Sequence, residues 1–268
     1  FYDGVFSWSR TLLALVGLVA LHMAVNIFNE WSDMRTGIDM ATERTPFSGG
    51  SGTLPAGEMT SRAAFVFGVA CAGTGLAVGL WFYARLGTVL VPILIVGAVC
   101  VLAYSDLLAK LGIGELAAGL GLGGLAVVGT TLVNTAEISR AAVAAGIPAT
   151  LMTFNLLLLN EFPDEKADRI GGRRHLVILL GRRGASLVFA AAAIGTPLSI
   201  MISVIVDALP ATCLAATLPS LLLAKPLRWA FSDPSQAVPI PALGANVVWI
   251  LATNTLMAVG LVAATILR

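Results

Sequence analysis

Long apolar runs separated by short polar stretches follow one another along the whole chain. Each run has about 18 to 24 residues, which is enough for an α-helix to cross roughly 30 Å of hydrocarbon. The eight runs lie at about 10–29, 61–84, 87–105, 114–135, 140–161, 184–205, 207–223 and 246–267. They are continuously apolar and do not alternate in segments of about ten residues, so the pattern predicts membrane-spanning helices and not a β-barrel.

Composition agrees with this pattern. The 268-residue chain is 57% hydrophobic and only 12% charged, which excludes an ordinary soluble domain and a disordered chain. Cys71, Cys100 and Cys213 all fall inside predicted spans without a C-x-x-C pair, so we interpret them as small packing residues. We expect a single all-α integral membrane domain over 1–268, with no nucleic-acid partner.

The charged residues concentrate on one side of the predicted membrane. If eight spans alternate in direction, twelve of the sixteen Lys and Arg residues follow spans one, three, five and seven. The positive-inside rule places that side in the cytoplasm and both ends of the sequence outside. Twelve of the fifteen acidic residues lie on the same side. Any chemistry is therefore expected at the cytoplasmic face of a multi-pass protein.

Two short segments resemble each other. NEWSD at 29–33 and NEFPD at 160–164 share the pattern Asn-Glu-aromatic-x-Asp, and each follows an apolar run at its polar end. This repetition predicts two related halves, about 1–112 and 113–268, that present equivalent acidic helix ends to one cavity.

The first segment places amide and carboxylate groups on one stripe of a helix. Asn26, Asn29 and Asp33 have the spacing i, i+3 and i+7, so they face the same way. Asp39 follows Gly37, where we expect the helix to break.

The second segment has the same character. Asn160, Asp164 and Asp168 lie at i, i+4 and i+8, again on one helix face. Oxygen ligands of this kind suit Mg²⁺, which prefers one or two carboxylates plus substrate phosphates, and two facing arrays have room for two or three ions on one diphosphate. The alternative is a solvated helix end with internal ion pairs, Asp164 with Arg169 or Asp168 with Arg173.

Basic residues accompany both acidic ends and are suited to neutralising phosphate oxygens. We select Arg44, Lys110, Arg173 and Arg174 as substrate-binding candidates, together with Asn26, Asn29 and Asn160. His175 lies in a polar connection, where a histidine is expected to be solvated.

These residues carry a resemblance. The chain resembles the UbiA-type intramembrane prenyltransferase superfamily, whose two aspartate-rich signatures correspond here to NEWSDMRTGID and NEFPDEKAD. The six-residue step from Asp33 to Asp39 across a glycine is similar to the branch that includes 1,4-dihydroxy-2-naphthoate polyprenyltransferases. The stretches at 44–57, 111–130 and 169–185 also match that branch.

The resemblance implies nine transmembrane helices around a central cavity, with cytoplasmic cap loops. Since eight spans are readable, we expect the family's first helix to precede residue 1. It also implies transfer of a polyprenyl group from a polyprenyl diphosphate to a hydrophobic or aromatic acceptor, in a prokaryotic inner membrane.

The family's metal and catalytic roles, carried over residue by residue, apply to both signatures. Asp33, Asp39, Asp164 and Asp168 take the catalytic role, and with Asn29 and Asn160 they form the Mg²⁺ ligand set. Glu30 and Glu161 stand where many members have Asp, and whether they bind metal stays open. Phe28, Trp31 and Phe154 are candidates for the wall around the carbocation.

Two other functions remain open. A UbiA-type terpene cyclase performs the same ionisation without an acceptor, and the divergent loop at 104–110 leaves room for that outcome. A membrane cation transporter requires acidic residues leading to the far face, and no mid-span position supplies one.

Overall fold

A computed structural model describes residues 2–267, and every regular element within them is helical. The long helices are α1 (Trp8–Thr36), α3 (Ser61–Leu86), α8 (Arg140–Ile170), α9 (Leu176–Ile205) and α11 (Ile240–Ile266). The shorter α-helices are α2 (Ile38–Ala41), α4 (Val91–Leu102), α5 (Ala109–Leu111), α6 (Gly114–Ala118), α7 (Leu125–Thr135) and α10 (Ala224–Ser232). Two 3₁₀ segments, η1 (Gly87–Leu90) and η4 (Ala211–Leu223), and two π-helical segments, η2 (Tyr104–Leu108) and η3 (Gly119–Gly124), complete the chain.

The predicted apolar runs are helical over almost all of their length. Six stretches of the described chain are long and apolar enough to cross a membrane, and one of them, Ser61–Leu102, contains both α3 and α4. The run at 207–223 differs from the prediction because it forms the 3₁₀ segment η4, which continues into α10. Pro219 lies inside this segment and has no amide hydrogen for an α-helical bond.

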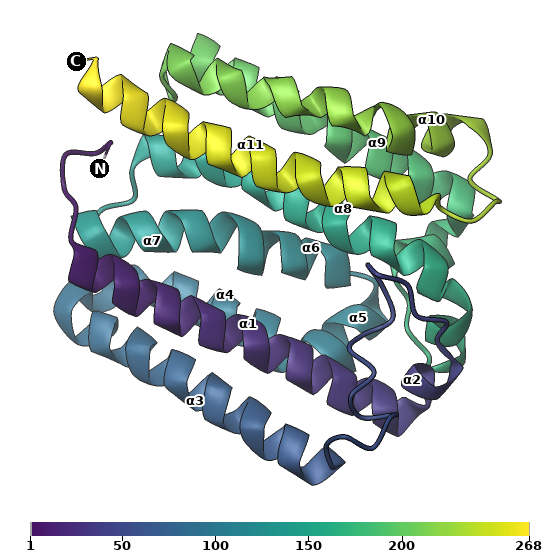
Figure 1. Ribbon diagram of the computed structural model, residues 1–268. Helices are drawn as coiled ribbons and strands as arrows, with labels where there is room; N and C mark the ends of the chain where they lie inside the picture. Colours follow the sequence, from purple (N-terminus) through teal and green to yellow (C-terminus); the bar gives the residue numbers. More distant parts are fainter. Residues whose placement is uncertain (1, 268) are drawn as a thin grey trace.

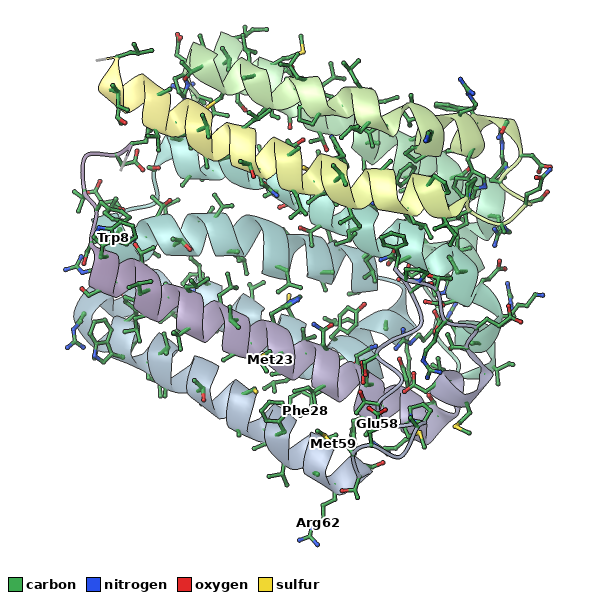
Figure 2. The ribbon with its side chains drawn as sticks, viewed as in Figure 1. Trp8, Met23, Phe28, Glu58, Met59 and Arg62 are labelled. Carbon is green, nitrogen blue, oxygen red and sulfur yellow. The ribbon has the colours of Figure 1, made fainter. Side chains whose placement is uncertain are left out.

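The helices lie roughly alongside one another, and the two ends of the bundle differ. Both termini lie at one end, whereas α2 and the connection over 42–60 lie at the other (Figure 1). α1 packs along α3, α8 along α9, and α11 along η4. Figure 2 shows Trp8 at the end with the termini and Glu58 and Arg62 at the opposite, polar end.

Small residues allow the helices to approach closely where η3 crosses α8. A Cβ atom at Gly123 would lie 2.4 Å from the carbonyl oxygen of Ala149, and one at Gly119 would lie 2.8 Å from that of Thr150. The glycine-rich stretch at 119–124 is therefore a packing surface, which lets α8 pack closely against the continuous helical segment formed by α6, η3 and α7.

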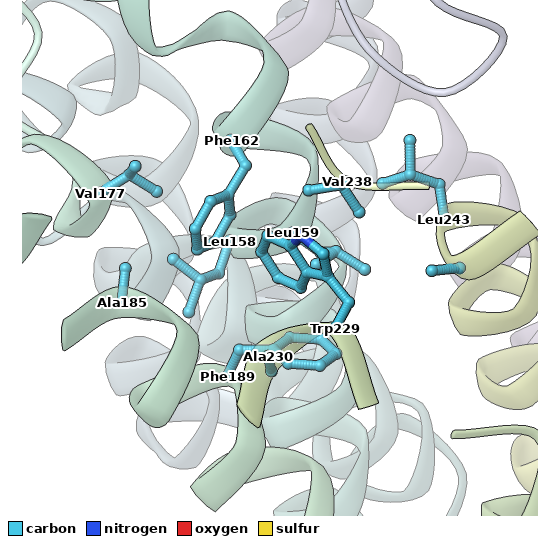
Figure 3. Packing of buried hydrophobic residues seen from close by; sticks show 11 residues of the cluster. Leu158, Leu159, Phe162, Val177, Ala185, Phe189, Trp229, Ala230, Val238 and Leu243 are labelled. Carbon is cyan, nitrogen blue, oxygen red and sulfur yellow. The ribbon is translucent and has the colours of Figure 1, made fainter. Parts of the chain in front are cut away.

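A buried apolar cluster holds the polar end of α8 in place. Leu158, Leu159 and Phe162 of α8 pack with Phe189 of α9 and Trp229 of α10 (Figure 3). The rings of Phe162 and Trp229 meet edge to face, with centroids 4.8 Å apart. The second acidic segment therefore rests on a rigid support.

Candidate active site

One cavity of about 400 Å³ opens at the polar end of the bundle and receives both acidic segments. Its polar wall includes Asn26, Asn29, Glu30, Asp33, Asp39, Tyr104, Asn160, Glu161, Asp164, Asp168 and Arg173. Farther along α1 the wall becomes apolar, with Leu18, Leu21, Val25, Val101 and Leu122. The cavity thus suits a molecule with a polar head and a hydrocarbon tail.

The break at Gly37 brings Asp39 to the same cavity as Asp33. In an unbroken helix, residues six positions apart point about 120° away from each other. Gly37 ends α1 with a left-handed φ of 82°, and the short helix α2 then turns Asp39 inward. Burial raises the pKa of Asp39, and the charge of Glu30 adds to this, while Arg44 and Arg173 oppose it.

The second segment needs no break because its spacing already matches one helix face. Asn160, Asp164 and Asp168 spread over only about 80° of α8. At 31 residues, α8 is about 46 Å long, so its last turns extend past the hydrocarbon layer. Asp164 Oδ1 is buried and has no hydrogen-bond partner within 2–267, which leaves a carboxylate oxygen available to a ligand.

Arg173 joins the two acidic segments. Its Nη2 donates to both carboxylate oxygens of Asp33, at 2.6 Å to Oδ2, and to Asn29 Oδ1 at 2.7 Å. Its Nη1 lies 3.5 Å from Asp168 Oδ1. Burial alone would lower the pKa of Arg173, but the carboxylates of Asp33 and Asp168 outweigh it and raise that pKa. One cation therefore connects α1 with α8.

The alternative interpretation of the second segment predicted two ion pairs, and the structure contains one of them. Asp168 does pair with Arg173, as that alternative predicted. Arg169 instead pairs with Glu165, with Nη2 3.1 Å from Oε1, so Asp164 stays free to face the cavity.

The other selected basic residues lie outside the cavity wall. Arg44 donates from Nη2 to the backbone oxygen of Asp39 at 3.3 Å, next to the cavity. Lys110 lies 3.9 Å from Asp106, and Arg174 is exposed; within the described chain neither lines the cavity. Substrate binding by these three residues stays a prediction.

Glu30 holds the glycine-rich loop at 48–52. Its Oε1 accepts a hydrogen bond from the Ser51 amide and its Oε2 one from the Ser51 hydroxyl, both at 2.8 Å. On the opposite wall, the amide of Gly49 faces Asp164. The loop is therefore bonded to the first acidic segment and lies beside the second, and the Glu30 carboxylate already has partners within the chain.

We predict that Glu30→Gln loosens this loop. A hydrogen bond to a charged group is worth about 1.5 kcal/mol or more, so the amides of 48–52 should exchange with deuterium about tenfold faster. Hydrogen–deuterium exchange mass spectrometry measures this directly. Glu58→Gln, at an exposed acid of the same connection, is the matched control, and equal exchange in both variants would remove the assigned role of Glu30.

Two buried residues behind the cavity were not anticipated. The expectation that His175 is solvated is wrong, because only 2% of it is exposed. Its Nε2 lies 3.3 Å from Asp168 Oδ2, and its Nδ1 lies 3.9 Å from Glu161 Oε2. Glu115 accepts a 2.6 Å hydrogen bond from the Leu176 amide and lies beside Glu161.

The aromatic wall also differs from the expectation. Phe28 and Trp31 pack against Phe65 of α3, with ring centroids 6.0 and 4.9 Å from it. Within 2–267, the aromatic side chains that line the cavity belong to Phe47 and Tyr104. Phe47 comes from the connection over 42–60, whose path the helical pattern does not predict.

The carboxylates are arranged in two separate groups. In the described chain, no three His, Cys, Asp or Glu side chains converge closely enough to hold a metal ion by themselves. A cation that takes one or two carboxylates and completes its coordination with water and a bound anion does fit, and the free Asp164 oxygen is available to it.

Comparison with known proteins decides the family. The model of the UbiA prenyltransferase family matches residues 2–243. The chain belongs to the UbiA prenyltransferase family. With its apolar helices, it is a multi-pass membrane protein.

Two curated relatives are 1,4-dihydroxy-2-naphthoate octaprenyltransferases. The chain is 27% identical over 189 residues to that of Bacillus subtilis (strain 168), covering 67% of this chain and 58% of the relative. It is 27% identical over 257 residues to that of Mycobacterium leprae (strain TN), covering 91% and 83%. The aligned part thus spans little more than half of the Bacillus protein.

Solved structures support the fold. A UbiA homologue from Archaeoglobus fulgidus bound to GPP and Mg²⁺ matches with a TM-score of 0.60 and 15% identity, over 94% of this chain and 89% of that one. The same homologue bound to DMAPP and Mg²⁺ matches with a TM-score of 0.61 and 16% identity, over 96% and 92%.

Proposed function

We propose that this protein transfers a polyprenyl group from a polyprenyl diphosphate to a hydrophobic or aromatic acceptor in the membrane, with Mg²⁺ as cofactor. The observation that carries the proposal is the single cavity in which two carboxylate groups and Arg173 meet at one end and apolar side chains continue from it. The names of the two curated relatives favour an aromatic, quinone-precursor acceptor.

The residues that would hold Mg²⁺ are Asn29, Asp33 and Asp39 on one wall and Asn160, Asp164 and Asp168 on the other, with two or three ions between them. Bound there, Mg²⁺ would draw charge from the leaving diphosphate as a Lewis acid. Asp164 suits this role best, since its Oδ1 is not engaged within 2–267.

The chain's other groups serve the ionisation in different ways. Arg173 stays protonated and lies among the carboxylates, so it supplies a fixed positive charge at the place where diphosphate charge develops. Loop 48–52, held by Glu30, covers the polar end. Apolar residues along α1 and α4 exclude water, so that the carbocation reacts with the acceptor and not with water.

We also propose that the active site faces the cytoplasm of a prokaryotic inner membrane. The distribution of charge supports this orientation, because twelve of sixteen basic residues lie on the side of the cavity. The chain termini lie at the opposite end (Figure 1).

Product analysis tests the proposal. Purified protein in lipid nanodiscs is given Mg²⁺, prenyl diphosphates of several lengths and a panel of aromatic acceptors, and products are identified by mass spectrometry. We expect acceptor masses increased by one prenyl group, lost in EDTA and restored by Mg²⁺. Hydrocarbon released without any acceptor would instead indicate a terpene cyclase, and undiminished product in EDTA would contradict the metal role.

A further inference from the structure

The connection between α8 and α9 encloses the Asp168 carboxylate from two sides. After α8 the chain turns back at Gly172, which has a φ of 80°, and the Arg173 amide bonds to the Asp168 carbonyl at 2.9 Å. This turn places the Arg173 guanidinium 3.5 Å from Oδ1 of Asp168 and the His175 ring 3.3 Å from Oδ2. Arg173 lines the cavity, whereas His175 lies behind it.

The surroundings of His175 are unusual for a packing residue. Both ring nitrogens are buried and have no hydrogen bond of standard geometry within 2–267, yet one faces Asp168 and the other Glu161. Burying an imidazole without a polar contact destabilises the folded state, so an apolar residue would be more favourable at this position. The position of the ring is explained if its partner is the carboxylate of Asp168.

The far side of this arrangement is anchored to the ends of other helices. Glu115 of α6 lies beside Glu161 of α8 and accepts a hydrogen bond from the Leu176 amide at the start of α9. The start of α9, where His175 lies, is therefore fixed relative to α8. The histidine is held in place on one side and contacts a proposed metal ligand on the other.

We propose that His175 is a positioning residue that sets the orientation of Asp168 and thereby the affinity of the site for its divalent cation. This inference rests on the proposed function. A residue that orients a metal ligand typically changes metal affinity by 10- to 100-fold when it is replaced.

The test is a Mn²⁺ titration followed by electron paramagnetic resonance, with a non-ionising prenyl thiolodiphosphate bound. We expect His175→Leu to raise the half-saturating Mn²⁺ concentration about tenfold. His175→Gln, which keeps an amide able to reach Asp168, should give a smaller rise. Thr196→Val removes a buried polar group from α9 far from the cavity and is the control for loss of stability.

The outcomes separate the two proposals. Absence of Mn²⁺ binding in the wild-type protein would remove the proposed function itself. If the wild type binds Mn²⁺ and His175→Leu binds it with the same affinity, only the role of His175 is overturned. The same conclusion follows if Thr196→Val loses as much Mn²⁺ affinity as His175→Leu. If the Leu variant does not fold, the Gln variant decides, and wild-type affinity there overturns the inference.

Discussion

Asp164→Ala is expected to reduce turnover about a thousandfold while leaving the protein as stable as the wild type. Asp164 is half-buried, and its Oδ1 atom is buried without a hydrogen-bond partner within 2–267, so the carboxylate adds little to folding. Loss of a charge-stabilising ligand of the leaving group is worth about 4 kcal/mol, which corresponds to that factor. Steady-state assays of prenyl transfer, with thermal unfolding in the same detergent, measure both effects.

Asp33→Ala should reduce turnover by a similar factor and, unlike Asp164→Ala, should also lower stability. Its carboxylate accepts two hydrogen bonds from Arg173, and the variant leaves that buried cation with Asp168 as its remaining acidic partner. Asp233→Ala is the matched control, since Asp233 is exposed. Full activity in either signature variant would exclude the metal–diphosphate account.

Arg173→Met is expected to destabilise the protein by about 3 kcal/mol, because removing one partner of a buried ion pair leaves the others uncompensated. The side chain is only 14% exposed and contacts both acidic segments, so α1 and α8 lose their shared cation. Arg173→Lys should recover part of this loss, since a single ammonium cannot match the fork of the guanidinium.

Arg173→Met also shows whether Arg173 acts in folding alone or also at the site where metal and diphosphate bind. Mg²⁺ with a bound thiolodiphosphate supplies positive charge to the same carboxylates, so it should stabilise Arg173→Met more than it stabilises the wild type. Arg169→Met is the control, because the Arg169 side chain is 59% exposed and its pair with Glu165 is worth less than about 1 kcal/mol. Equal stability of the Arg173 and Arg169 variants would contradict the assigned link between the segments.

Much of the site follows from helical spacing. Asn29 and Asp33, and likewise Asn160 and Asp164, are each four residues apart, and a helix places such pairs on one face whatever surrounds it. Gly37 was expected to break α1, and its left-handed φ does so. These features are local, so the pattern of residues predicts them.

The sequence did not identify residues whose contacts form only when a connection folds back against the helices. His175 stands beside two arginines in a polar stretch, and only the turn at Gly172 buries it against Asp168. Glu115 is one acid in an apolar run, and its role appears only when α6 meets α9. Lys110 Nζ lies 3.9 Å from Asp106 Oδ1 at the partly exposed surface, and its role in substrate binding stays a prediction. The division into two halves near residue 112 stays a prediction.

The most direct test of the account is whether a metal ion held by both signatures contacts the diphosphate. In the Mn²⁺-loaded protein with a prenyl thiolodiphosphate bound, ³¹P electron–nuclear double resonance reports direct Mn–O–P contact through the hyperfine coupling. We predict a strong ³¹P coupling in the wild type that disappears in both Asp33→Ala and Asp164→Ala. Bound Mn²⁺ without this coupling in the wild type, or an unchanged coupling in both variants, would contradict the account.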